Sequence, residues 1–309
     1  MYSEKIRLFE NREDITLTTY IQNDADKILG GLKRPAILIC PGGGYMKCAT
    51  QEAEPVALRF AAMGYHTFVL RYSTYFSLDS EGTFPKEKED IKVREHCIFP
   101  NPMLEIAKAM LLIREHSEEW NVDVERVGLC GFSAGAHNVA MYANNWNTEL
   151  VSNYFKTSSE NFRPMAVILG YIAGDYYFTK IDEIEETKEL FFRVSYTAIV
   201  GKQELSDEDI ERMSPSKHVN RDTPPTFLWA TYEDHTVSVK NTLKLAESLA
   251  DNRIPFEVHI FEEGHHGLSL ATQESAKVKM QINQDAAKWV ELAEAWLQKR
   301  MSLALPEFI

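Results

Sequence analysis

The sequence predicts an α/β fold with a mostly parallel central sheet and helices on both faces. Short, continuously apolar runs such as 36–40 and 166–171 recur along the chain, and this composition is typical of strands buried on both faces. Segments with helical spacing lie between these runs, which is the order that parallel crossover units require. With 309 residues, of which 44% are hydrophobic, the chain is long enough for one large domain over 1–309.

The first part of the chain alternates strand, loop, helix and strand. Residues 15–21 alternate between apolar and polar side chains, which suits an antiparallel strand at a sheet edge. The apolar run 36–40 ends abruptly at the glycine-rich segment 41–45. A helix with an inward apolar face is expected over 54–62, and Gly64 would end it. The next strand is expected over 65–70.

The middle of the chain contains the strongest helical pattern. Pro102 suits the first turn of a helix, and apolar residues recur at helical spacing from there to Trp120. A short strand is expected over 127–130, and a helix over 134–144 follows it at once.

The remaining elements continue the alternation. Strands are expected over 166–171, 226–231 and 256–261. Helices are expected over 237–249 and over 276–298, where the amphipathic pattern is long.

Two segments interrupt this rhythm, and each is a candidate lid or cap. Segment 72–100 contains a charged tract and shows neither helical nor strand periodicity. A solvated surface insertion is its simpler interpretation, and a lid or pocket wall is the functional alternative. Segment 174–222 is acidic, irregular and partly helical, with a helix start predicted at Ser206 and the three acidic residues 207–209 after it.

Charge and cysteine content narrow the classes of function. A formal net charge of −13 disfavours nucleic acid as a partner. The chain begins with polar residues, and no apolar run approaches the roughly 20 residues of a membrane helix. Four cysteines without a Cys-x-x-Cys pair point to neither a zinc site nor redox chemistry. We therefore expect a cytoplasmic protein with no cofactor, no metal and no membrane partner. The sequence is compatible with a monomer and with a homo-oligomer.

The strand at 127–130 leads into Gly131-Phe132-Ser133-Ala134-Gly135, a Gly-x-Ser-x-Gly motif placed between a strand and a helix. In a nucleophile elbow this turn is so sharp that the serine hydroxyl stands exposed above the sheet. Glycines fit where a Cβ would clash in such a turn, and the helix N-terminus favours developing negative charge. The alternative interpretation is a strand-to-helix turn that needs its glycines only for packing.

A serine hydroxyl needs a base and an orienting carboxylate to act as a nucleophile at neutral pH. Glu233 and Asp234 follow the strand at 226–231, and His265 and His266 follow the last strand. These loops leave their strands at the same end that presents Ser133, in the order serine, acid, histidine.

Together these motifs resemble the α/β-hydrolase superfamily, in the esterase branch that includes acetyl-xylan-esterase-like and related carbohydrate acetyl esterases. The matching segments span most of the chain: 41–45, 54–57, 131–135, 224–229, the Asp234 loop and 266–270. Pro41 stands where many lipases carry a histidine. Segment 72–100 also departs from the family pattern, so the resemblance does not predict the shape of the pocket.

The resemblance implies roles for individual residues. Ser133 would be the nucleophile, His266 the base and Asp234 the acid, with Glu233 the weaker choice. The N–H groups of Gly43, Gly44 and Ala134 would form the oxyanion hole. The other nearby histidines are expected to be surface or supporting residues: His137, His235 and His265.

The resemblance also implies a substrate class, namely short acyl esters, acetyl above all, of sugars or other small alcohols. Tyr72, Tyr75 and Trp229 are candidates for stacking on a sugar, although core packing suits Trp229 better because it lies in a strand. A peptidase or thioesterase on the same scaffold is the nearer alternative. A hydrolase-like protein that only binds its ligand is the more distant one.

Overall fold

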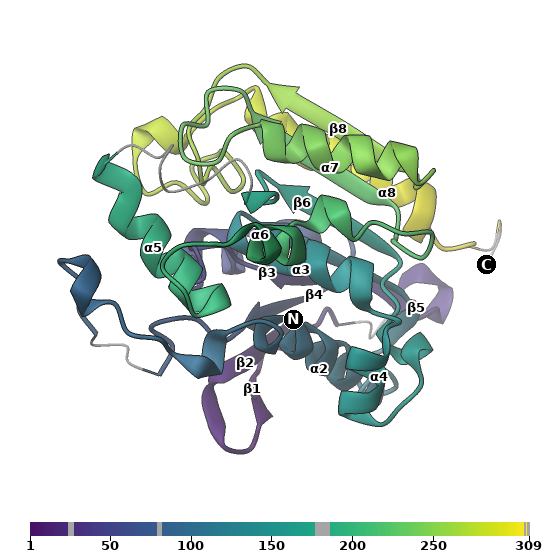
Figure 1. Cartoon of the computed structure of the whole chain (residues 1–309). Helices are drawn as coiled ribbons and strands as arrows, with labels where there is room; N and C mark the ends of the chain where they lie inside the picture. The colour runs from purple at the N-terminus through teal and green to yellow at the C-terminus, as the bar shows by residue number, and fades with distance from the viewer. Residues whose placement is uncertain (24–27, 79–81, 177–185, 306, 308–309) are drawn as a thin grey trace.

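The computed structural model describes the chain except for residues 24–27, 79–81, 177–185, 306 and 308–309. Its described part contains an eight-stranded sheet in the order β1-β2-β4-β3-β5-β6-β7-β8 (Figure 1). The strands are β1 (Lys5–Phe9), β2 (Arg12–Tyr20), β3 (Arg34–Cys40), β4 (His66–Arg71), β5 (Val122–Phe132), β6 (Ala166–Gly170), β7 (Thr226–Thr231) and β8 (Phe256–Phe261). Strand β2 is antiparallel to both of its neighbours, and the pairs from β4 to β8 are all parallel.

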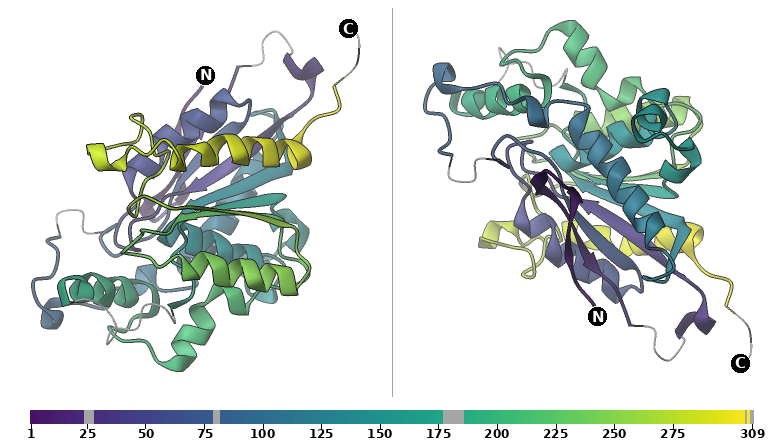
Figure 2. Two further views of the ribbon diagram at one scale, coloured as in Figure 1. Left: turned by 90° about the horizontal axis from the view of Figure 1, so that it is seen from above. Right: turned by 90° about the horizontal axis from the view of Figure 1, so that it is seen from below.

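Helices cover both faces of the sheet, as the sequence predicted (Figure 2). The α-helices of the described part are α1 (Glu54–Ala62), α2 (Asn101–Glu115), α3 (Ala134–Asn145), α4 (Glu149–Phe155), α5 (Glu186–Val200), α6 (Asp207–Met213), α7 (Lys240–Asp251) and α8 (Trp289–Met301). Successive β3 side chains enter opposite cores. Leu38 belongs to the apolar cluster that includes residues of α2, α3 and α7, whereas Ile37 and Ile39 belong to the cluster that includes residues of α1 and α8. This explains why the parallel strands are continuously apolar.

The predicted edge position of the first strand is wrong. Of the expected strand over 15–21, residues 15–20 do lie in an antiparallel strand, β2, but β1 pairs with its outer side. Strand β1 is short and carries Lys5 and Arg7, which suits a sheet edge because charged side chains discourage pairing with another chain.

Two helices are shorter than their sequence patterns indicated. The helix expected over 102–120 ends at Glu115, after which Trp120 folds back to pack on Phe68 of β4. The helix expected over 276–298 begins only at Trp289, after two short 3₁₀ turns. Its earlier part is interrupted because the Asn283 side chain accepts the N–H groups of the second and third residues after it, as a capping residue does.

The two irregular segments are partly ordered against the sheet. In 72–100, Tyr72 and Tyr75 are buried whereas most of the charged tract is exposed; residues 79–81 lie outside the described part. Segment 174–222 is partly helical, as predicted, and contains α6 and also α5, whose bounds were not predicted; residues 177–185 are outside the described part. The predicted helix start is correct, because Ser206 and Asp209 cap each other's backbone N–H groups.

Within the described residues, every helix is too short or too polar to span a lipid bilayer.

Candidate active site

Ser133 occupies the tight turn between β5 and α3 with φ 50° and ψ −120°, a conformation that a non-glycine residue rarely adopts. Its flanking glycines are required sterically. A Cβ on Gly131 would lie 2.6 Å from the carbonyl oxygen of Gly135, and one on Gly135 would lie 2.1 Å from the carbonyl oxygen of Cys40. The Gly-x-Ser-x-Gly motif thus has the strand–turn–helix context that was expected for an elbow.

Three loops that follow β5, β7 and β8 bring Ser133, Asp234 and His266 together. Ser133 Oγ lies 2.8 Å from His266 Nε2, and His266 Nδ1 lies 2.6 Å from Asp234 Oδ2. Both contacts are within hydrogen-bonding distance, so the three side chains form one continuous polar chain. The carboxyl ends of parallel strands share one edge of the sheet, which is why residues 133 positions apart in sequence can meet.

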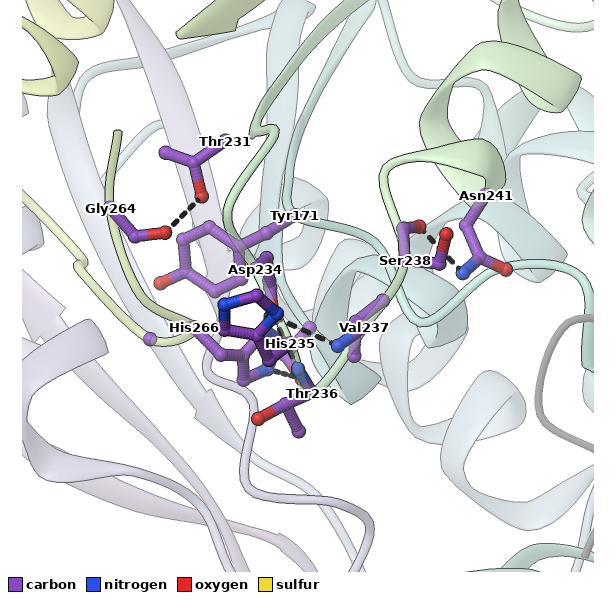
Figure 3. A network of polar contacts seen from close by, with 12 residues as sticks. Tyr171, Thr231, Asp234, His235, Thr236, Val237, Ser238, Asn241, Gly264 and His266 are labelled. Atoms are coloured by element: carbon purple, nitrogen blue, oxygen red, sulfur yellow. Dashed lines mark hydrogen bonds and ion pairs between the residues drawn. The ribbon is translucent and has the colours of Figure 1, made fainter. Parts of the chain in front are cut away.

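Asp234 is held in place by its own loop. Its Oδ1 accepts the backbone N–H groups of Thr236 at 2.9 Å and Val237 at 2.8 Å, while Oδ2 faces His266 (Figure 3). The carboxylate is only 1% exposed, and its hydrogen bonds compensate for its removal from water. This arrangement fixes both the carboxylate and the imidazole that it faces.

The alternative site residues lie elsewhere. Glu233, His235 and His265 are exposed, and among the described residues the Glu233 carboxylate accepts only a long, 3.4 Å hydrogen bond from Gly264 N–H. His137 is fully buried, with Nδ1 2.7 Å from the Tyr45 hydroxyl. Burial lowers the pKa of His137 to about 4, so this ring is neutral at physiological pH.

The glycine loop after β3 lies beside Ser133. Gly43 and Gly44 have φ values of 122° and 62°, and a Cβ on Gly43 would lie 2.1 Å from the carbonyl oxygen of Lys47. The N–H groups of Gly43, Gly44 and Ala134 donate to no acceptor among the described residues. They are therefore available to a ligand bound at Ser133.

Two hollows of different size meet at Ser133 and His266. The smaller one, of about 40 Å³, is mainly apolar, and its wall includes Ala134, Phe191, Tyr196 and Val237. The larger one is a groove of about 850 Å³. Its wall mixes polar and aromatic side chains, among them Asp14, Arg71, Phe76 and Phe84.

The chain matches the BD-FAE family over residues 29–249, which is most of its length. It belongs to that family. Its structure also resembles that of a carboxylesterase from Lactobacillus plantarum WCFS1, with a TM-score of 0.77 and 25% identity over 97% of this chain and 98% of that one. The structure of an acetyl ester-xyloside bifunctional hydrolase from Caldicellulosiruptor lactoaceticus matches with a TM-score of 0.71 and 27% identity, over 96% of each chain.

Among curated sequences, the endo-1,4-beta-xylanase B of Butyrivibrio fibrisolvens is 30% identical over 84% of this chain and 35% of its own. The chain spans 35% to 52% of the length of the curated relatives that it matches. The α/β-hydrolase fold and the resemblance to esterases, both predicted from sequence, are confirmed by this family membership and these structures.

The walls of this BD-FAE member's site differ from what the sequence predicted. Tyr72, Tyr75 and Trp229, the candidates for stacking on a sugar, are at most 2% exposed, so none of them offers a free face for that contact. Phe191 lines both hollows and belongs to α5, whose bounds the sequence did not predict. Glu52, which also lines the groove, was not singled out either.

Proposed function

We propose that the protein is a serine ester hydrolase that cleaves short acyl esters, chiefly acetyl esters, of sugars or oligosaccharides. The observation that carries this proposal is the unbroken hydrogen-bonded chain from Asp234 through His266 to Ser133, at the junction of a small hollow and a wide groove. In this role Ser133 is the nucleophile, His266 the general base and Asp234 its orienting carboxylate.

The reaction follows from the positions of the protons. Asp234 accepts the Nδ1 hydrogen of His266, which leaves Nε2 free to take the Ser133 proton as Oγ attacks the ester carbonyl carbon. The N–H groups of Gly43, Gly44 and Ala134 stabilise the oxyanion of the tetrahedral intermediate. His266 then protonates the leaving alcohol as the ester C–O bond breaks. In the second half, water attacks the acyl carbonyl carbon while His266 takes one of its protons. His266 returns that proton to Ser133 Oγ as the bond between Oγ and the acyl carbon breaks, and the carboxylic acid leaves.

The two hollows suit an ester of unequal halves. A water molecule needs roughly 10–15 Å³ of such volume, so the hollow of about 40 Å³ holds only a few non-hydrogen atoms, the size of an acetyl group. The groove of about 850 Å³ is large enough for a sugar or a short oligosaccharide as the alcohol. Relatives named as a xylanase and an acetyl ester-xyloside hydrolase support this substrate class. A cytoplasmic location is kept as part of the proposal, since the four cysteines are free thiols.

The test is hydrolysis of p-nitrophenyl acetate by purified wild type, Ser133→Ala, His266→Ala and His265→Ala. The first two variants should lose nearly all turnover, whereas His265→Ala, a matched change at the exposed neighbour, should keep it. Unchanged turnover by Ser133→Ala would end the proposal.

A panel of acetylated xylo-oligosaccharides, longer acyl esters, aminoacyl amides and thioesters tests the substrate class. A preference for acetylated sugars is the expected result. Preference for an amide or a thioester would identify the protein as a peptidase or a thioesterase instead of an ester hydrolase.

A further inference from the structure

Glu52 is a buried carboxylate that contacts two of the loops around Ser133. It ends the 3₁₀ turn Thr50–Glu52 just before α1 and is only 2% exposed. Its Oε2 accepts the N–H of Gly42 at 2.7 Å, and its Oε1 accepts the hydroxyl hydrogen of Tyr171, also at 2.7 Å. No other acidic side chain in the described part of the chain accepts from the glycine loop.

On one side, Glu52 holds the beginning of the glycine loop against the nucleophile. Gly42 packs so closely there that a Cβ on it would lie 2.8 Å from the Cβ of Ser133 and 2.9 Å from Glu52 Oε2. Gly43 and Gly44 follow directly, so the direction of their N–H groups depends on where Gly42 is held. A shift of Gly42 would move the proposed oxyanion donors away from the reacting carbonyl.

On the other side, Glu52 holds the histidine loop through Tyr171. The Tyr171 hydroxyl oxygen accepts the N–H of Ser269, three residues after His266, at 3.0 Å. The Tyr171 ring also meets the His266 ring edge-on, with centroids 5.1 Å apart (Figure 3). A second link runs in parallel, because Ser269 Oγ donates to the carbonyl oxygen of Gln51 at 2.6 Å.

We propose that Glu52 is a positioning residue for the proposed ester hydrolysis, which sets the oxyanion donors and His266 in one fixed geometry. This inference rests on the proposed function. A carboxylate suits the position because it offers one oxygen to each of two donors, whereas a glutamine offers one acceptor and one donor group. Burial raises the pKa of Glu52, and the hydrogen bonds from Tyr171 and Gly42 oppose that shift.

The experiment compares wild type with Glu52→Gln, Tyr171→Phe and the double variant. Glutamine can keep the bond from Gly42 N–H, but its amide group then turns a donor toward the Tyr171 hydroxyl. The Tyr171 hydrogen loses its acceptor, and the amide competes with Ser269 N–H for the Tyr171 oxygen, which disrupts the link to the histidine loop. A displacement of about 1 Å at a reacting group can cost about 100-fold in rate. We therefore expect kcat for p-nitrophenyl acetate to fall by about tenfold to 100-fold in Glu52→Gln, with KM changed by less than about twofold.

Two further readouts separate positioning from stability. Affinity for a boronic acid, which forms a tetrahedral adduct on the nucleophile, should weaken in proportion to kcat. The double variant should be little worse than Glu52→Gln alone, because both changes break the same link. The control is Asp209→Asn at the start of α6, a similarly buried carboxylate whose partners are Lys202, Ser206 and Arg212. It should lower the unfolding temperature and leave kcat unchanged.

Wild-type kcat in Glu52→Gln, or an equal loss of kcat in Asp209→Asn at a matched fall in unfolding temperature, would overturn the inference. If Glu52→Gln does not fold, Tyr171→Phe decides alone, with a fall in kcat of at least about fivefold expected and wild-type kcat contradicting the inference. Ser133→Ala in the same assay keeps the two proposals apart. An active Ser133→Ala removes the proposed function, whereas an inactive one beside a fully active Glu52→Gln removes only the role of Glu52.

Discussion

Replacing Asp234 with asparagine should nearly abolish turnover, because it forces the wrong tautomer on His266. The backbone N–H groups of Thr236 and Val237 both donate to Asp234 Oδ1, so they would hold the single oxygen of the asparagine amide. The amide nitrogen would then face His266 Nδ1, which becomes an acceptor. The imidazole hydrogen moves to Nε2 and points at Ser133, where it can no longer accept the serine proton.

The magnitude follows from this competition. Turning the asparagine amide around would leave two backbone N–H groups without an acceptor, at about 1–3 kcal/mol each. The unproductive tautomer should therefore persist. The corresponding change in a serine protease triad lowers kcat by about 10⁴-fold, which is about 5.4 kcal/mol of barrier.

The assay is kcat for p-nitrophenyl acetate, with Glu233→Gln as the matched control at the exposed neighbour. Glu233→Gln should stay within about twofold of wild type, because the only hydrogen bond that its carboxylate makes within the described part of the chain is the 3.4 Å contact with Gly264. Nitrogen NMR of the imidazole should find the hydrogen on Nε2 in Asp234→Asn. Turnover above about a tenth of wild type in Asp234→Asn, or a large loss in Glu233→Gln, would refute the reasoning.

Three other changes test separate parts of the structure. Phe191→Ala removes a wall of the small hollow, so kcat/KM for p-nitrophenyl hexanoate relative to acetate should rise about tenfold or more, and an unchanged ratio would show that Phe191 does not limit acyl length. Gly135→Ala places a Cβ 2.1 Å from the Cys40 carbonyl oxygen, so soluble folded protein or its unfolding temperature should fall sharply; a wild-type unfolding temperature would contradict the steric argument. Burial raises the pKa of Glu105 from 4.5 to about 8. The contribution of this side chain to the free energy of unfolding is therefore fully present below pH 4.5 and is lost as the pH rises to about 8. The unfolding temperature of Glu105→Gln should therefore fall less than that of wild type between pH 5 and pH 8.5. Parallel curves of unfolding temperature against pH would contradict the raised pKa of Glu105.

The parallel strands and the elbow could be predicted from sequence because their signals are local. A strand buried on both faces is continuously apolar, and the turn at Ser133 tolerates only glycine at its tightest points. The meeting of Ser133, Asp234 and His266 was anticipated because loops that follow parallel strands emerge at one sheet edge.

The walls of the site could not be predicted, since their positions depend on contacts distant in sequence. Helix α5 spreads its apolar residues around its circumference, because parts of it face the core and Phe191 faces the hollows, so no single stripe identifies it. Glu52 lies just before a helix, where an acidic residue needs no special explanation. Only the fold reveals its contacts with Gly42 and Tyr171.

The most direct test of a serine-centred reaction is to label the purified protein with a fluorophosphonate and to locate the adduct by peptide mass spectrometry. We expect one phosphonyl group per chain, on the peptide that contains Ser133, with loss of esterase activity in step with labelling. An adduct on another residue, or full hydrolysis of p-nitrophenyl acetate by completely labelled protein, would contradict this account.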